Sequence, residues 1–102
     1  KIIQNAEYIY TNDYLKYFDE NGINVLNNIE ELSYKFESIY NIMQERRVCS
    51  TLQILIRDRD GIIGMVSFDV IGLHRRKWSE LDISLLYLEA GIIGDAIRKE
   101  IS

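Results

Sequence analysis

The longest regular pattern of apolar positions lies near the end of the chain, after Ser79. Apolar residues recur there in steps of three and four, which is the spacing of side chains on one face of an α-helix. Ser79 followed three residues later by Asp82 is typical of a capping box at a helix N-terminus. The pattern therefore predicts a helix from Ser79 to about Glu100.

This predicted helix carries two apolar stripes. One comprises Leu81, Leu85, Leu88, Ile92 and Ala96, and the other Ile83, Leu86, Ala90, Ile93, Ile97 and Ile101. A helix on one side of a sheet needs a single apolar face, so we expect a second layer against the other. We assign the face formed by Leu86, Ala90, Ile93, Ile97 and Ile101 to a homodimer contact. The alternative is that a helix preceding this chain covers that face.

Alternation of apolar and polar residues predicts a β-hairpin before the helix. In residues 48–57, Leu52, Ile54 and Ile56 form one fully apolar face. Asp60-Gly61 is typical of a hairpin turn, and residues 62–70 form the return strand. Gly64 within that strand indicates a bulge or a close backbone approach.

The first half of the chain is less regular. Residues 7–11 favour a strand, and residues 14–18 a helical turn or packed loop closed by a turn at Asn21-Gly22. Apolar spacing after Asn28 predicts one helix, or two short ones, ending near Arg47. Asn28 and Glu31 resemble a capping box.

Composition indicates one globular domain over all 102 residues, with 47% apolar and 27% charged residues. The net charge of −4 argues against nucleic acid, because phosphate binding needs a basic surface. We interpret the basic clusters Arg46-Arg47 and 74–77 as solvated loops. No signal peptide and no apolar run of about 18 residues is found, so we expect a cytoplasmic chain without direct membrane contact.

No catalytic residue, metal site or cofactor is expected. Phosphate loops, nucleophile elbows and metal motifs are missing, and Cys49 is the only cysteine. We interpret Cys49 as a small apolar residue that packs at a strand start. Its position near Arg46-Arg47 leaves a reactive thiol as the alternative. His74 is expected to be an exposed loop residue.

Three stretches resemble GAF domains. Residues 49–56 (CSTLQILI) and 60–69 (DGIIGMVSFD) are similar to the late hairpin of that family, and residues 76–86 (RKWSELDISLL) to its loop-to-helix junction. The combination most resembles GAF sensors found upstream of bacterial diguanylate cyclases and sensor kinases. The resemblance implies an α+β fold of PAS/profilin-like architecture. It also implies that an antiparallel sheet carries helices packed on one face, with a pocket beneath the middle segment on the other.

The resemblance is good from residue 48 to 101 and weak before it. The family's first helix and first two strands have no counterpart before Glu7, which implies a single partial domain truncated at its N-terminus. Cyclic-nucleotide-binding members carry a spaced constellation that the contiguous Phe18-Asp19-Glu20 does not match. Bilin-binding members need a neighbouring cysteine and histidine, and Cys49 and His74 lie on opposite sides of the predicted hairpin.

Candidate residues follow from the aromatic cluster and the resemblance. Pocket candidates are Tyr8, Tyr10, Tyr14, Tyr17, Phe18, Ser50 and Leu52, with core and rim as the alternative for the aromatic residues. An Asp69–Arg76 ion pair and a packed Trp78 are expected to be structural.

The sequence thus predicts a non-catalytic sensor domain. It would bind a small molecule or partner and relay the signal through its last helix to an output domain, such as a diguanylate cyclase or histidine kinase. The alternative is a dimerisation module without a small ligand.

Overall fold

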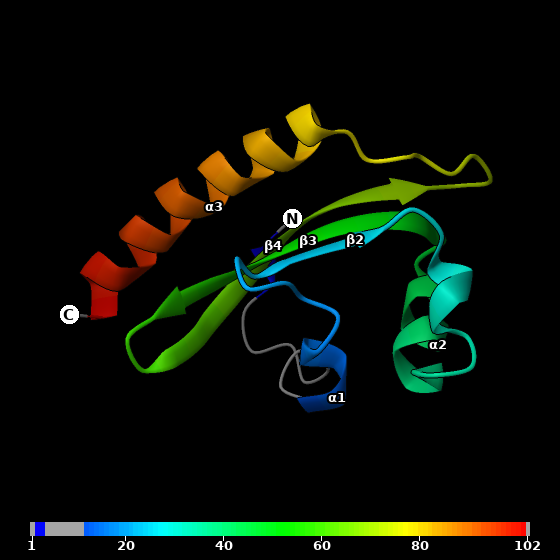
Figure 1. Cartoon of the computed structure of the whole chain (residues 1–102), viewed down its shortest axis with the longest axis horizontal. Helices are drawn as coiled ribbons and strands as arrows, with labels where there is room; N and C mark the ends of the chain where they lie inside the picture. Colours follow the sequence, from blue (N-terminus) through cyan, green and yellow to red (C-terminus); the bar gives the residue numbers. More distant parts are fainter. Residues whose placement is uncertain (1, 4–11, 102) are drawn as a thin grey trace.

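A four-stranded antiparallel sheet forms the centre of the computed structural model, which describes residues 2–3 and 12–101. The elements in chain order are β1 (Ile2–Ile3), α1 (Asn12–Leu15), β2 (Ile23–Leu26), the 3-10 helix η2 (Ile29–Leu32), α2 (Glu37–Glu45), β3 (Val48–Asp58), β4 (Gly61–Ile71) and α3 (Glu80–Ile101). The sheet order is β1-β4-β3-β2. Helix α3 crosses one face of the sheet, and α1 and α2 lie on the other side (Figure 1). The expected α+β fold with an antiparallel sheet is confirmed.

The long β3–β4 hairpin gives the sheet two different faces. Leu52, Ile54 and Ile56 of β3 pack with Val66 of β4 in the core beneath α3. The alternate residues, such as Leu55 and Met65, belong to a second core under residues 14–43. The register shifts between Ile56, opposite Gly64, and Arg57, opposite Ile62, so the predicted irregularity at Gly64 is a β-bulge.

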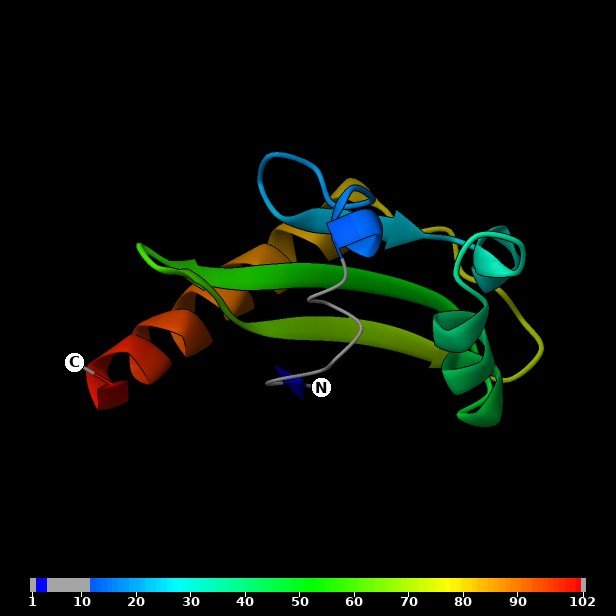
Figure 2. The same ribbon diagram turned by 90° about the horizontal axis from the view of Figure 1, so that it is seen from below.

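The predicted helix after Asn28 is two short helices, η2 and α2. The Asn28 side chain caps η2 by accepting a hydrogen bond from the Glu30 backbone N–H at 3.0 Å, one residue before the predicted partner. Ile29 and Leu32 of η2 and Ile39 and Met43 of α2 are buried in the second core. In Figure 2, α2 lies at the end of the sheet where β3 begins and β4 ends.

Two strands were not predicted. In β2 the polar Asn24 is buried while Val25 is 37% exposed, which reverses the usual alternation and hides the strand in the sequence. Strand β1, which precedes Glu7, pairs with Val66 and Met65 of β4 and was not expected from the sequence. The strand predicted at 7–11, with Tyr8 and Tyr10, lies outside the described residues.

Helix α3 has the two apolar faces that its sequence predicts, but their assignment was wrong. Leu86 and Ala90 are buried against the sheet, and Ile93 and Ile97 pack beside them. The residues assigned to a dimer contact therefore face the chain's own core; the Ile101 side chain is outside the described residues. The exposed residues are instead those of the other stripe, Leu81, Leu85, Leu88 and Ile92.

The two glycines of α3 differ in their surroundings. A Cβ at Gly94 would lie 3.0 Å from the Ile56 side chain, so glycine permits the close approach of helix and sheet. A Cβ at Gly91 would meet no atom within 4 Å. The described contacts therefore account for only one of them.

Replacing Leu86 with Ala tests which stripe meets the sheet. Leu86 is 1% exposed, so Leu86→Ala should lower the free energy of unfolding by about 2–5 kcal/mol. Leu88 is 64% exposed, so the matched control Leu88→Ala should change it by no more than about 0.5 kcal/mol. Urea denaturation of both variants in dilute solution measures the difference. A larger loss for Leu88→Ala would contradict the observed orientation of α3.

Candidate functional site

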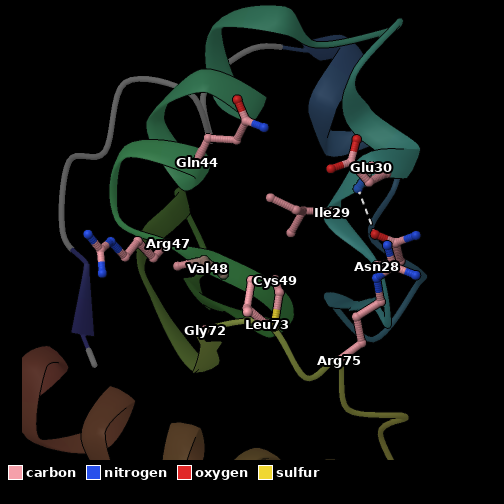
Figure 3. Close-up of a pocket in the computed structure, with 10 residues that line it drawn as sticks. All are labelled: Asn28, Ile29, Glu30, Gln44, Arg47, Val48, Cys49, Gly72, Leu73 and Arg75. Carbon is pink, nitrogen blue, oxygen red and sulfur yellow. Dashed lines mark hydrogen bonds between the residues drawn. The ribbon is translucent and has the colours of Figure 1, made fainter.

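A cavity of about 540 Å³ lies at the end of the sheet where β3 begins and β4 ends (Figure 3). Its lining comes from the start of η2, the end of α2, the start of β3 and the loop after β4. The lining residues are Asn28, Ile29, Glu30, Gln44, Arg47, Val48, Cys49, Gly72, Leu73 and Arg75. Small-molecule sites typically have volumes of about 300–1,000 Å³, so this cavity is large enough for a ligand.

The backbone at Arg47 shapes one wall of the cavity. Arg47 has a left-handed conformation, with φ of 59°, and turns the chain from α2 into β3. Its carbonyl accepts a hydrogen bond from the Gly72 N–H at 3.0 Å. This contact brings the loop after β4 against the turn before β3. The two basic clusters of the sequence are therefore on segments that border the same cavity.

Cys49 lies in a β-bulge beside that contact. Val48 pairs with Ile71 and Ser50 with Val70, which leaves Cys49 without a partner across the hairpin. Its thiol lies 3.4 Å from the backbone carbonyl oxygens of both Val70 and His74, so its single S–H donates to one of them or is shared between them. The prediction from the sequence that Cys49 and His74 lie apart is wrong. Antiparallel pairing puts the start of β3 next to the end of β4, so the Cys49 thiol lies beside the His74 backbone. The imidazole of His74 is exposed.

The lining carries an excess of positive charge. Arg47 and Arg75 are exposed, and neither forms an ion pair with any residue that the structure describes. The one acidic side chain in the described lining is Glu30, whose carboxylate accepts a hydrogen bond from the Tyr40 hydroxyl at 2.8 Å. This hydrogen bond raises the pKa of Tyr40.

Residues 72–79 connect the cavity directly to α3. The Arg76 N–H donates to the Ser50 Oγ at 2.9 Å, and its guanidinium forms an ion pair of 2.6 Å with Asp82 in the first turn of α3. The predicted Asp69–Arg76 pair is wrong. Asp69 instead accepts a hydrogen bond from the Thr51 hydroxyl at 2.7 Å, because its side chain shares a face with Thr51.

Trp78 fastens the same loop to the end of β2. Its backbone N–H donates to the Asn27 side chain at 2.8 Å, and its indole Nε1 donates to the Leu26 carbonyl at 3.3 Å. The indole is buried against Phe68 under α3. Ser79 and Asp82 form the predicted capping box, with reciprocal hydrogen bonds of 2.9 and 3.1 Å. The start of α3 is thus held by several bonds to the cavity loop and the sheet.

A group of buried polar side chains lies on the face of the sheet opposite α3. The Asn24 side chain donates to the Gln53 Oε1 at 3.1 Å, and the Tyr14 hydroxyl donates to the same oxygen. All three side chains are buried. Every buried side-chain polar atom of the described residues has a hydrogen-bond partner, so this cluster is a satisfied part of the core.

The sequence-predicted pocket residues that the structure describes do not line this cavity, and Tyr8 and Tyr10 lie outside the described residues. The structure brings Tyr14, Tyr17 and Phe18 together, with ring centroids of Tyr14 and Phe18 5.6 Å apart, in and beside the second core. Ser50 and Leu52 are on the α3 side of β3. The sequence analysis missed the lining residues Asn28, Gln44, Arg47, Leu73 and Arg75. One signal in the sequence could have indicated these residues: the two basic clusters lie just before and just after the predicted hairpin.

The described residues contain neither a metal-binding cluster nor a membrane-spanning helix. No group of three or more His, Cys, Asp or Glu side chains there is placed to hold a metal ion. No helix in the described part of the chain has the length and apolar character needed to cross a membrane.

Comparison with solved structures shows the GAF fold. GAF3 of Slr1393 from Synechocystis sp. PCC6803, in its photoproduct state, matches with a TM-score of 0.71 and 14% identity, over 96% of this chain and 60% of that one. The cyanobacteriochrome receptor PixJ matches with a TM-score of 0.58 and 16% identity, over 78% of this chain and 51% of that one. The chain thus spans little more than half the length of these structures. By sequence it matches no family model and no curated protein. The chain is a GAF-like domain by fold.

Replacing Asp82 with Asn tests the junction between the cavity loop and α3. The hydrogen bond from the Ser79 backbone and the Arg76 guanidinium hold the pKa of Asp82 below its ordinary value of 3.8. Its contribution to stability is therefore present above that value and is lost as the pH falls through the lowered pKa. Asp82→Asn should speed amide exchange in the first turn of α3 at neutral pH.

The matched control is Asp95→Asn, which removes an exposed ion pair with Arg98 in the same helix. It should leave exchange in the first turn unchanged. Hydrogen exchange followed by mass spectrometry measures both variants, and equal effects would show that Asp82 has no special role at the junction.

Proposed function

We propose that this chain is a non-catalytic sensor domain. The cavity beside Cys49 takes a small molecule, and α3 carries the effect to an output domain. One observation supports this most directly: Gly72, Leu73 and Arg75 line the cavity, and the next residues of the same loop cap α3. The GAF-like fold supports a signalling role.

The proposed relay follows from the bonds around Arg76. Arg75 directly precedes Arg76. A ligand in contact with Leu73 and Arg75 therefore displaces the loop immediately before Arg76. Arg76 is bonded at its backbone to Ser50 and at its side chain to Asp82, so loop movement changes the start of α3. A ligand shifts such an equilibrium only by binding its two states differently. The loop supplies that difference because it is both cavity wall and helix cap.

The solved structures with this fold have names that describe light response: a photoproduct state for GAF3 of Slr1393, and dark and illuminated states for PixJ. Sequence identities of 14% and 16% do not support assigning the stimulus or the output of those proteins to this chain. An attached diguanylate cyclase or histidine kinase as the output domain is part of the proposal, on the resemblance of the loop-to-helix junction.

Cys49 allows the relay to be tested without a known ligand. It lines the cavity and is the only cysteine, so monobromobimane can be attached there alone. The tethered group should occupy the cavity and change amide exchange in residues 76–86, because the loop transmits the displacement. Hydrogen exchange of labelled and unlabelled protein measures the effect.

The control carries the same label at the far end of the hairpin, in the double variant Cys49→Ser, Arg59→Cys. Arg59 is exposed in the β3–β4 turn, so that label should leave α3 unchanged. The relay is refuted when the label at Cys49 changes exchange only beside the cavity, in residues 47–50 and 72–75.

The exposed stripe of α3 supports a homodimer as the second part of the proposal. Leu81, Leu85, Leu88 and Ile92 follow each other at spacings of four, three and four, which is the a/d pattern of a coiled-coil seam. Each is at least half exposed in the single chain. Two copies of such a seam are self-complementary about a two-fold axis. The same surface would serve the alternative function, a dimerisation module without a small ligand.

Placing charges in the seam tests the dimer. Leu85→Glu with Leu88→Glu should convert a dimer to a monomer, because like charges would face each other in an apolar contact. The control Tyr34→Glu changes a residue that is 99% exposed and distant in sequence from α3, and should leave the mass unchanged. Size-exclusion chromatography with light scattering measures the mass. A wild-type monomer at concentrations near 100 µM, about the range in which a weak dimer assembles, would exclude this interface.

A further inference from the structure

We propose that the cavity recognises a small organic anion, a carboxylate or phosphate monoester with an apolar body. This inference rests on the proposed function, because it names the ligand class for the same cavity. Arg75 and Asn28 would hold the anionic group. Leu73, with Ile29 and Val48, would cover the apolar body.

The charge of the ligand follows from the cations around the cavity. The whole chain has a net charge of −4, yet Arg47 and Arg75 line this cavity and have no ion-pair partner among the described residues. Arg46, His74 and Lys77 are also exposed on the two segments that meet there. Clustered charges of one sign raise the local concentration of oppositely charged ligands. An anion is therefore favoured over a neutral molecule or a cation.

Asn28 supplies a second donor at one place on the wall. Its Oδ1 accepts a hydrogen bond from the Glu30 N–H at 3.0 Å, which leaves the Nδ2 group to donate elsewhere. In Figure 3 the Arg75 side chain points toward Asn28, whereas Arg47 lies across the cavity from them. A guanidinium and an amide N–H₂ in one cavity lining are suited to the oxygens of a carboxylate or phosphate.

The apolar part follows from Leu73. It is 95% exposed although it lines the cavity, and the apolar side chains of Ile29 and Val48 lie in the same lining. An inorganic ion would leave Leu73 uncovered, whereas an alkyl or aryl body would remove it from water. The cavity volume of about 540 Å³ limits this body to the size of a small molecule.

Paired probes test the ligand class. Phenylbutyrate with 4-phenylbutanol, octanoate with octanol, and phenyl phosphate with phenol each differ in the anionic group. Calorimetry and amide chemical shifts of Cys49, Gly72 and Arg75 measure binding. At least one anion should bind about tenfold more tightly than its neutral counterpart, since charge-assisted hydrogen bonds are roughly twice as strong as neutral ones.

Variants then locate the contacts. Arg75→Gln should weaken binding of that anion about tenfold and abolish its preference over the alcohol, since the charge is lost. Arg59→Gln, at the far hairpin turn, should change affinity less than about twofold because it removes an exposed charge distant from the cavity. Leu73→Ser should weaken the anion and the alcohol alike. Equal affinities for every pair, or no effect of Arg75→Gln, would overturn the proposal.

The outcome is separable from that of the proposed function. A Cys49 label that alters α3, combined with equal binding of anions and alcohols, overturns only the ligand class. Failure of every probe at millimolar concentration overturns the ligand class too, whereas failure of the label overturns the relay. Binding to vesicles containing phosphatidylserine, without binding of any soluble probe, would assign the cations to a lipid surface and also reject the proposal.

Discussion

The antiparallel pairing of β3 with β4 is the interaction on which the rest of the structure depends. Its register runs from Asp58 opposite Gly61 to Val48 opposite Ile71. Because the strands run in opposite directions, the turn before β3 and the loop after β4 meet at one end. That meeting creates the cavity, brings Arg47 to Gly72, and places Cys49 beside the His74 backbone. The same two strands supply the apolar floor on which α3 packs.

The loop between β4 and α3 connects the cavity to the helix that packs on these two strands. It is short, and nearly every residue of it has a role: Leu73 and Arg75 line the cavity, Arg76 bonds to Ser50 and Asp82, and Trp78 bonds to the end of β2. A segment held at so many points moves as a unit. The proposed signal transfer across it requires no long chain of contacts, because the cavity wall and the helix cap are neighbours in the sequence.

Local patterns predicted the hairpin, an irregularity at Gly64, helical structure after Asn28 and the capped helix α3, since each depends on residues close in the sequence. The patterns failed where burial reversed the expected alternation. Asn24 is buried because Gln53 and Tyr14 accept hydrogen bonds from its amide. The apolar–polar pattern of β2 could not predict these bonds, because both partners lie outside that strand. The predicted Asp69–Arg76 pair failed for a similar reason. Asp69 accepts a hydrogen bond from Thr51, and Arg76 pairs with Asp82.

The orientation of α3 on the sheet could not be predicted from the sequence. The sequence by itself determined that this helix has two apolar stripes, because periodicity depends only on residue spacing. Only the tertiary structure decided that Leu86 and Ala90 meet the sheet while Leu85 and Leu88 remain exposed, since both stripes satisfy the same helical spacing. The choice depends on shape: Gly94 lets one side of the helix approach Ile56 closely. The candidate cavity was likewise decided in three dimensions, because its walls come from segments that are distant in the chain.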